Sequence, residues 1–344
     1  MRRYLPILLM SFFILIIVLA GSIYLPGYAD EKKAESMKNI TVYTTLPVEQ
    51  AAVLALEYEK YQSVRINVVP LAENDLILKL KTESLNPQAD IVLATKTVLE
   101  QAKKNNLLEQ VTSEQLDIIP KRFKDENNYW YGLWYDPMIF VVNKDIQKIS
   151  PQIPTSWRDL SRDSKLRIGI TDFLAAEASA NLLYTLTSVN GETQTLAFLK
   201  KLHPQVVQYS KFLATPVRMV GMCEADVAIA VQSEASRYIK DSFPIKIVYP
   251  TDGTAYLLTG AGLVTKSIHK SEAKTFIDWL MQNNAQNALQ KSKFYYVPTN
   301  PELPEYKEFN QKNIELLENK EIVTLEQKHR LLDKWIQTVR ISSK

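Results

Sequence analysis

Two polar turns in the first third of the chain combine residue types that suit anion binding. Thr44 and Thr45 follow a β-rich run and precede Pro47, which favours the first turn of a helix. Thr95 and Lys96 follow a second apolar run and precede a second helical pattern. The free backbone N–H groups and the macrodipole of a helix start favour an anion, and Lys96 adds a cation. The alternative is that Thr45 only caps its helix and that Lys96 only faces solvent.

Later positions also carry polar groups that could line a ligand pocket. Tyr131 lies in an aromatic stretch with more rings than one strand face can bury, although core packing explains part of it. Tyr209 ends a predicted strand with its polar tip. Ser233 and Glu234 begin a predicted helix, where Glu234 could bind a cation or a polyol, or only complement the helix dipole. Asp252 falls in a turn that follows another strand.

The chain lacks the sequence signals of most catalytic and cofactor sites. It has one cysteine, Cys223, three scattered histidines and only 9 glycines, with no nucleotide loop, zinc motif or nucleophile elbow. The pair Tyr295–Tyr296 could offer phenolates to ferric iron, although Val297-Pro298 after it indicates an extended, packed segment. We therefore expect no enzyme activity, no metal site and no cofactor. A hydrolase stays open, because carboxylates that meet only in space are invisible in one sequence.

Length and charge predict a globular protein of two domains. The chain has 344 residues, and about 150 residues is a usual domain size. Its 41 lysines and arginines nearly balance 38 acidic residues, which gives a formal charge of +3. A nucleic-acid-binding protein normally shows a basic excess on one face, so we expect no nucleic-acid partner.

The N-terminal segment predicts export. Arg2 and Arg3 precede an uncharged run that ends in the small-residue sequence Gly27-Tyr28-Ala29, and this pattern fits a signal peptide over residues 1–29. The alternative is an uncleaved membrane anchor over residues 5–25. The charged residues 30–39 then form a linker.

The rest of the chain alternates β-rich and helical patterns, which predicts βαβ units with mainly parallel sheets. The fold class is α/β: two doubly wound lobes joined by a hinge, with C-terminal helices at about 302–317 and 325–339. We expect lobe 1 at 40–138 plus about 256–300, lobe 2 at 139–255, and the helices of 301–344 packing on the lobes. Such sheets bind ligands at the carboxyl ends of their strands, so the cleft between the lobes is the expected site.

Several segments resemble, in order and spacing, a known family. From Ile40 to Asn300 the chain resembles ABC-transporter solute-binding proteins of the type 2 periplasmic-binding class, closest to the ferric-iron or phosphorylated-solute binding group. The matching segments are 40–47 (ITVYTTLP), 87–92 (PQADIV), 129–133 (YWYGL), 154–160 (PTSWRDL), 207–211 (VQYSK), 248–254 (VYPTDGT) and 273–280 (AKTFIDWL).

The resemblance implies which residues contact the ligand, and it also shows departures. The implied contacts are Thr44, Thr45, Thr95, Tyr131, Tyr209, Ser233, Glu234 and Asp252. At 175–178 (AAEA) and 211–213 (KFL) the chain lacks the polar loops that its relatives use for phosphate. Glu177 would repel an anion if it faced the cleft. The tyrosine pair that many iron binders carry near 231–235 is absent as well.

The resemblance also implies a function outside the cytoplasm. We expect a monomer at the periplasmic or extracellular face of the cytoplasmic membrane, in contact with the membrane only through its N-terminal segment. It would close by hinge motion on a small polar or anionic solute, or on ferric iron, and deliver it to an ABC-transporter permease. The alternative partner is a two-component sensor kinase.

Overall fold

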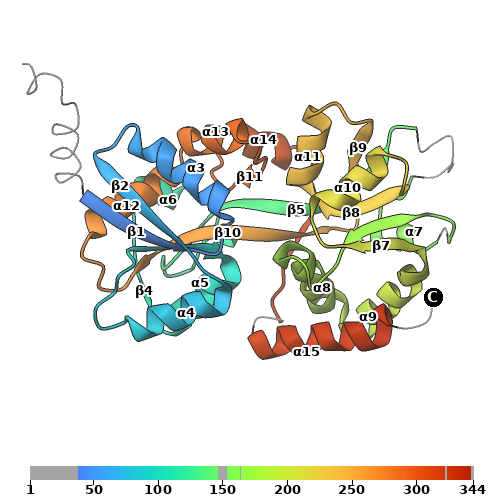
Figure 1. Cartoon of the computed structure of the whole chain (residues 1–344), viewed down its shortest axis with the longest axis horizontal. Helices are drawn as coiled ribbons and strands as arrows, with labels where there is room; N and C mark the ends of the chain where they lie inside the picture. The colour runs from blue at the N-terminus through green and yellow to red at the C-terminus, as the bar shows by residue number, and fades with distance from the viewer. Residues whose placement is uncertain (1–37, 146–152, 163, 322–323, 342–344) are drawn as a thin grey trace, which may run out of the picture.

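The computed structural model describes residues 38–145, 153–162, 164–321 and 324–341 (Figure 1). The predicted signal peptide or anchor and most of the predicted linker lie outside these residues. Among the described residues, no helix has the length and apolar character that a membrane crossing requires.

Lobe 1 is a sheet covered by helices on both faces (Figure 1). Its strand order is β2-β1-β3-β10-β5, with the first three strands parallel and β10 antiparallel to β3. The sheet strands are β1 (Lys38–Thr44), β2 (Val64–Pro70), β3 (Ile91–Thr95), β10 (Thr254–Val264) and β5 (Tyr131–Asn143), with the short β4 (Leu108–Glu109) and β11 (Val297–Pro298). The helices are α3 (Val48–Glu59), α4 (Glu73–Thr82), α5 (Lys96–Lys104), α6 (Glu114–Asp117), η1 (Lys121–Phe123), α12 (Lys270–Leu280), α13 (Asn283–Lys291) and α14 (Pro304–Asn310).

Lobe 2 repeats the arrangement with a smaller sheet. Its order continues as β5-β8-β6-β7, where β8, β6 and β7 are parallel and β9 pairs with β5. The strands are β6 (Ile168–Thr171), β7 (Val206–Ser210), β8 (Val227–Val231) and β9 (Ile245–Val248). The helices are α7 (Trp157–Leu160), α8 (Glu177–Asn190), α9 (Glu192–Leu202), η3 (His203–Gln205), α10 (Ala214–Gly221) and α11 (Gln232–Lys240).

Two long strands, β5 and β10, join the two lobes. β5 pairs with β10 from Tyr131 to Pro137 and with β8 from Met138 onward, so one strand serves both sheets. A C-terminal segment makes a further crossing: β12 (Leu316–Leu317) pairs with β10, and α15 (Leu325–Trp335) with the π-helical η4 (Ile336–Arg340) then packs on lobe 2.

The first C-terminal helix is shorter than its sequence pattern predicts. Pro304 begins α14, but the helix ends at Asn310 and Asn313 adopts a positive φ of 51°. A left-handed residue interrupts a helix, and the chain after it extends to form β12. The second predicted helix, at 325–339, matches α15 and η4 closely.

Each lobe has its own hydrophobic core. The lobe 1 core joins β1, β3 and the first half of β5 to α3, α4, α5, α12 and α13. Lobe 2 buries one cluster on each face of its sheet, and α15 adds Leu331, Trp335 and Val339 to one of them. These separate cores support the predicted division into lobe 1 at 40–138 plus about 256–300 and lobe 2 at 139–255, and we propose these bounds for the two lobes.

Candidate functional site

The parallel strands of both lobes end at the boundary between the lobes. β5 runs from lobe 1 into lobe 2, and β8 is antiparallel to it, so β8 and its parallel neighbours run back toward lobe 1. β10 runs from lobe 2 into lobe 1, and β3 is antiparallel to it, so β1, β2 and β3 run toward lobe 2. The helix starts that follow these strands therefore face one another across the boundary, where doubly wound sheets place their ligands.

An ion cluster bridges this boundary. Lys328 on α15 places its ammonium nitrogen 2.8 Å from Glu177 Oε1, at the start of α8, and 3.8 Å from Glu73 Oε2, at the start of α4. Thr95 donates a hydrogen bond of 3.1 Å to Glu73 Oε1. The Lys328 ammonium also lies 5.3 Å from the centre of the Tyr184 ring. Burial raises the pKa of Glu177, while the nearby Lys328 charge opposes that rise.

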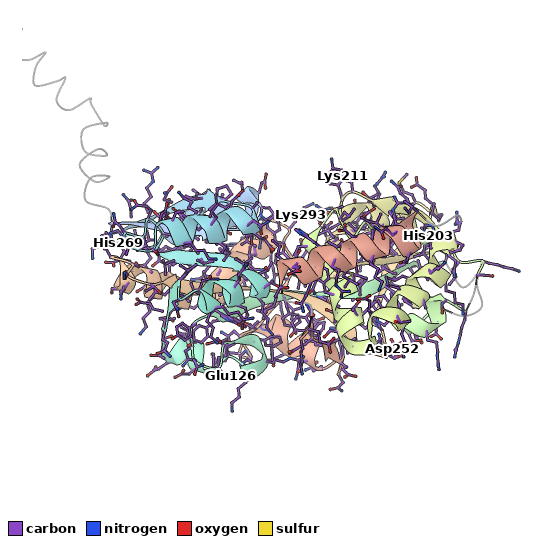
Figure 2. The ribbon with its side chains drawn as sticks, turned by 90° about the horizontal axis from the view of Figure 1, so that it is seen from below. Glu126, His203, Lys211, Asp252, His269 and Lys293 are labelled. Carbon is purple, nitrogen blue, oxygen red and sulfur yellow. The ribbon has the colours of Figure 1, made fainter. Side chains whose placement is uncertain are left out.

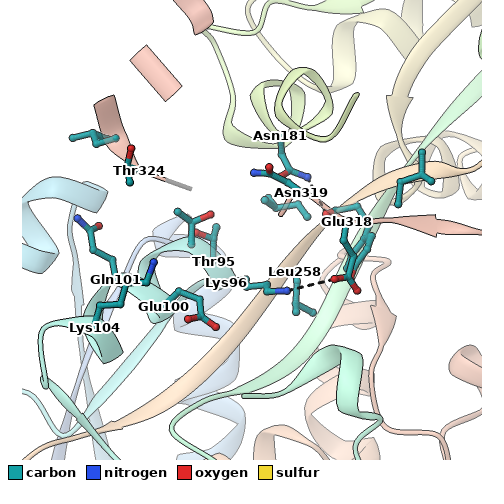
Figure 3. Close-up of a pocket in the computed structure, with 15 residues that line it drawn as sticks. Thr95, Lys96, Glu100, Gln101, Lys104, Asn181, Leu258, Glu318, Asn319 and Thr324 are labelled. Atoms are coloured by element: carbon teal, nitrogen blue, oxygen red, sulfur yellow. Dashed lines mark hydrogen bonds and ion pairs between the residues drawn. The ribbon is translucent and has the colours of Figure 1, made fainter. Parts of the chain in front are cut away.

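A cavity of about 170 Å³ opens beside this cluster (Figure 3). Lobe 1 contributes the first turns of α5, lobe 2 contributes Asn181 of α8, and the C-terminal crossing segment contributes Glu318 and Asn319. The Lys96 ammonium faces Glu318 at 3.9 Å, and the Asn181 amide donates to the Tyr256 carbonyl at 2.9 Å. The remaining lining residues are Thr95, Thr97, Glu100, Gln101, Lys104, Tyr256, Leu257, Leu258, Leu317, Thr324 and Leu325.

Three predicted contacts lie at helix starts on the lobe 1 side. Thr95 and its neighbour Lys96 line the cavity. Thr44 is fully buried, where its hydroxyl donates to the Leu93 carbonyl and accepts from the Leu46 N–H, so its polar group is already used by the fold. The Thr45 hydroxyl oxygen is buried and has no hydrogen-bond partner among the described residues.

Ser233 and Glu234 lie at the start of α11 on the lobe 2 side. Ser233 gives both its N–H and its hydroxyl to Asp136 of β5, at 2.9 and 2.5 Å. Glu234 pairs with Arg237 one turn along the helix, at 2.5 Å, and burial raises the pKa of its carboxyl. The carboxylate of Asp136 therefore already occupies the start of α11, and the carboxylate of Glu234 lies beside it.

Of the eight predicted contacts, Thr95 is the one that lines the cavity. The last three predicted contacts serve the fold of one lobe or the other. Tyr131 is fully buried in lobe 1 and donates to the Val111 carbonyl. Tyr209 packs beneath Trp335, with its hydroxyl 2.9 Å from His203 Nδ1. Asp252 lies in lobe 2 (Figure 2) and accepts the backbone N–H of Trp157, at 3.0 Å, to cap α7.

Sequence reasoning missed Glu73, Asn181 and Lys328. One signal could have found Lys328. It precedes Leu331, Trp335 and Val339 by three, seven and eleven residues, so helical spacing places a lysine on the apolar face. A lysine in that position needs a buried partner. Nothing in the sequence indicates that the partners come from both lobes.

The cavity has the character of a small-molecule binding site. Its lining combines leucine side chains with charged side chains of both signs, as is usual for small-molecule pockets. Among the described residues, no group of three or more histidine, cysteine or acidic side chains could hold a metal ion. Fold and site together define a two-lobed binding protein.

Comparison with known proteins identifies the family. Residues 86–320 match the family model described as bacterial extracellular solute-binding protein, so the chain belongs to that family. Its members act outside the cytoplasm, and the predicted class, fold and location are confirmed.

Individual relatives are named for, or were solved with, different ligands. The chain is 21% identical to iron uptake protein A1 of Synechocystis, over 79% of this chain and 80% of that protein. It is 24% identical to a putative 2-aminoethylphosphonate-binding periplasmic protein of Salmonella typhi, over 68% and 69%. The fold matches the periplasmic binding protein AfuA of Actinobacillus pleuropneumoniae, solved with fructose-6-phosphate, with a TM-score of 0.71, 24% identity and coverage of 89% and 100%.

Proposed function

We propose that this protein captures a small organic solute that joins a compact anionic group to hydroxyl or ammonium groups, and that it holds this solute in the interlobe cavity. Aminophosphonates and sugar phosphates are the two classes of this kind that relatives are named for or solved with. One observation carries the proposal: residues of both lobes line the same cavity, and Lys96 stands there at the start of α5.

The charges of the cavity support a solute with groups of both kinds. Lys96 and the N–H groups of the first turn of α5 suit an anion. Glu100 and Glu318 on the same walls suit hydroxyl or ammonium donors, because carboxylates only accept hydrogen bonds. The apolar side chains of Leu257 and Leu258 in the lining suit a carbon skeleton better than they suit a bare ion.

We further propose that the protein delivers this solute unchanged to an ABC-transporter permease. Relatives of the family are periplasmic binding proteins of such transporters, among them a probable one of Sinorhizobium fredii. A sensor kinase is the alternative recipient, and a solute-dependent interaction with one or the other membrane protein distinguishes them.

A thermal-shift panel tests the solute class. We expect 2-aminoethylphosphonate or a hexose phosphate to raise the melting temperature in a saturable way, because a ligand that binds only the folded state stabilises it by mass action. Lys96→Met should weaken that solute about tenfold, the effect of about 1.4 kcal/mol. Lys200→Met, an exposed change on α9, is the matched control. A response to ferric citrate alone would contradict the organic class, and no response to any of these compounds would contradict the proposed solute class.

A further inference from the structure

Lys328 is a buried cation that belongs to neither βα lobe by sequence. It lies in the first turn of α15, whose start is fixed by a capping box between Thr324 and Gln327. Its side chain is only 4% exposed. A buried ammonium is costly unless it is paired, and its partners here are Glu177 and Glu73. Those partners come from opposite lobes.

The two ion pairs differ in what they connect. Glu177 begins α8, which packs in the lobe 2 core, and α15 is fixed to the same core through Leu331 and Trp335. Arg330 and Lys334 of α15 both pair with Glu192 of α9, also in lobe 2. Lys328 and Glu177 therefore move together when the lobes separate.

Glu73 belongs to the other body. It begins α4, whose apolar face packs in the lobe 1 core, and Thr95 of β3 donates to its second oxygen. The Lys328–Glu73 contact, at 3.8 Å, is thus a buried ion pair that opening must break. Without Lys328, closure would bring two carboxylates together with no cation between them, which like-charge repulsion opposes.

We propose that Lys328 is a built-in latch: it links Glu73 of lobe 1 to Glu177 of lobe 2 and sets the open–closed equilibrium of the protein before any solute arrives. The latch rests on the proposed cleft between the lobes, but not on the identity of the solute. Because it biases the empty protein toward the closed state, it also sets how much of the intrinsic binding free energy of a solute is lost to closing the lobes.

The distance between the lobes can be measured without any solute. Cys223 is an exposed cysteine of lobe 2, and Leu85→Cys adds a second position on lobe 1 at a residue that is 87% exposed. Labels at the two sites report the open and closed populations by single-molecule energy transfer. The informative variant is Glu73→Gln, because it removes the lobe 1 charge and leaves Lys328 paired with Glu177.

A second interlobe ion pair provides the matched control. Lys293, which follows α13 at the lobe boundary (Figure 2), pairs with Asp241 at the end of α11 at 2.9 Å, with side chains 58% and 46% exposed. Exposed pairs of this kind contribute little, so Asp241→Asn should change the populations less than about twofold. Glu73→Gln should shift the open-to-closed ratio about tenfold toward open, a usual size for coupling between two sites.

Each outcome bears on the latch. Equal populations in Glu73→Gln, in Asp241→Asn and in the parent protein would overturn it. Lys328→Met should open the lobes at least as far, and if that variant unfolds, Glu73→Gln still decides. Because solute is absent, failure of the solute panel leaves this result intact, and failure of the latch leaves the solute panel intact.

Discussion

Asp136 lies at the point where β5 passes from one lobe to the other. The next residue, Pro137, is the last to pair with β10, and Met138 is the first to pair with β8. The Asp136 carboxylate accepts both donors of Ser233 at the start of α11, so it fixes the crossing strand to lobe 2. Burial raises the pKa of Asp136 to about 7, although the hydrogen bonds from Ser233 lower it.

This raised pKa predicts a specific pH dependence of stability. An unfolded aspartate has a pKa of about 3.9. Between that pH and pH 7, Asp136 is therefore more protonated in the folded protein than in the unfolded chain. Stability conferred by this group is therefore present at low pH and is lost as pH rises toward 7. Asp136→Asn cannot titrate, and it should gain roughly 2 to 4 kcal/mol relative to the parent protein between pH 5 and pH 8.

Urea unfolding at several pH values checks this prediction. Ser233→Ala removes a donor that favours the charged carboxylate, so it should move the titration to higher pH. Parallel stability curves for Asp136→Asn and the parent protein over pH 5 to 8 would show that Asp136 does not titrate in this range.

At the scale of elements, α15 is anchored in the lobe 2 core by a large aromatic side chain. Trp335 is fully buried and packs against Phe173 and Tyr209, with ring centroids 4.9 and 5.7 Å away. Trp335→Ala should lower the free energy of unfolding by about 3 to 5 kcal/mol, the usual cost of emptying such a site. His329→Ala, at an exposed position of the same helix, should stay within about 0.5 kcal/mol. Denaturant unfolding measures the stability of both variants. Equal midpoints for Trp335→Ala and the parent protein would mean that the packing of α15 contributes nothing to the stability of lobe 2.

The elements were more predictable than their junctions. Alternating apolar patterns such as Ile40-Thr41-Val42-Tyr43 predict strands correctly, because one buried face per element leaves a local signal. The sequence pattern does not show that β5 is one strand through both lobes, since every residue from Tyr131 to Asn143 is buried and the run carries no alternation. The two lobes meet there through long-range pairing, which local patterns do not record.

Some residues at the site follow from local sequence patterns, and others do not. The position of Thr95 and Lys96 at a sheet edge was predictable, because a strand ends there before a helix begins, while their contact with a solute stays a prediction. Tyr131 and Tyr209 are polar-tipped residues that the fold satisfies internally, with a backbone carbonyl and with a histidine. Glu73 and Lys328 are 255 positions apart, and only the tertiary fold brings their charges together. A single sequence records residue types, but not which charges become neighbours.

At the scale of the whole molecule, two separate cores and three crossing segments allow the lobes to move as rigid bodies. β5, β10 and the segment around β12 lie side by side, so they can bend together while each core stays packed. Hinge closure of this kind places a solute in contact with both lobes at once. No step of that cycle requires a bond in the solute to be made or broken.

This architecture predicts one solute per chain, recovered unchanged. The cavity lies between the two lobes, and the charged and polar residues in its lining can form hydrogen bonds and ion pairs with a solute. Native mass spectrometry with 2-aminoethylphosphonate or fructose-6-phosphate should show a single added mass on a monomeric chain. Solute extracted after prolonged incubation should give its original spectrum, and Lys96→Met should lose the added mass at the same concentration while Lys200→Met keeps it. A second equivalent bound with equal strength, or a chemically altered solute, would contradict a single interlobe binding site without catalysis.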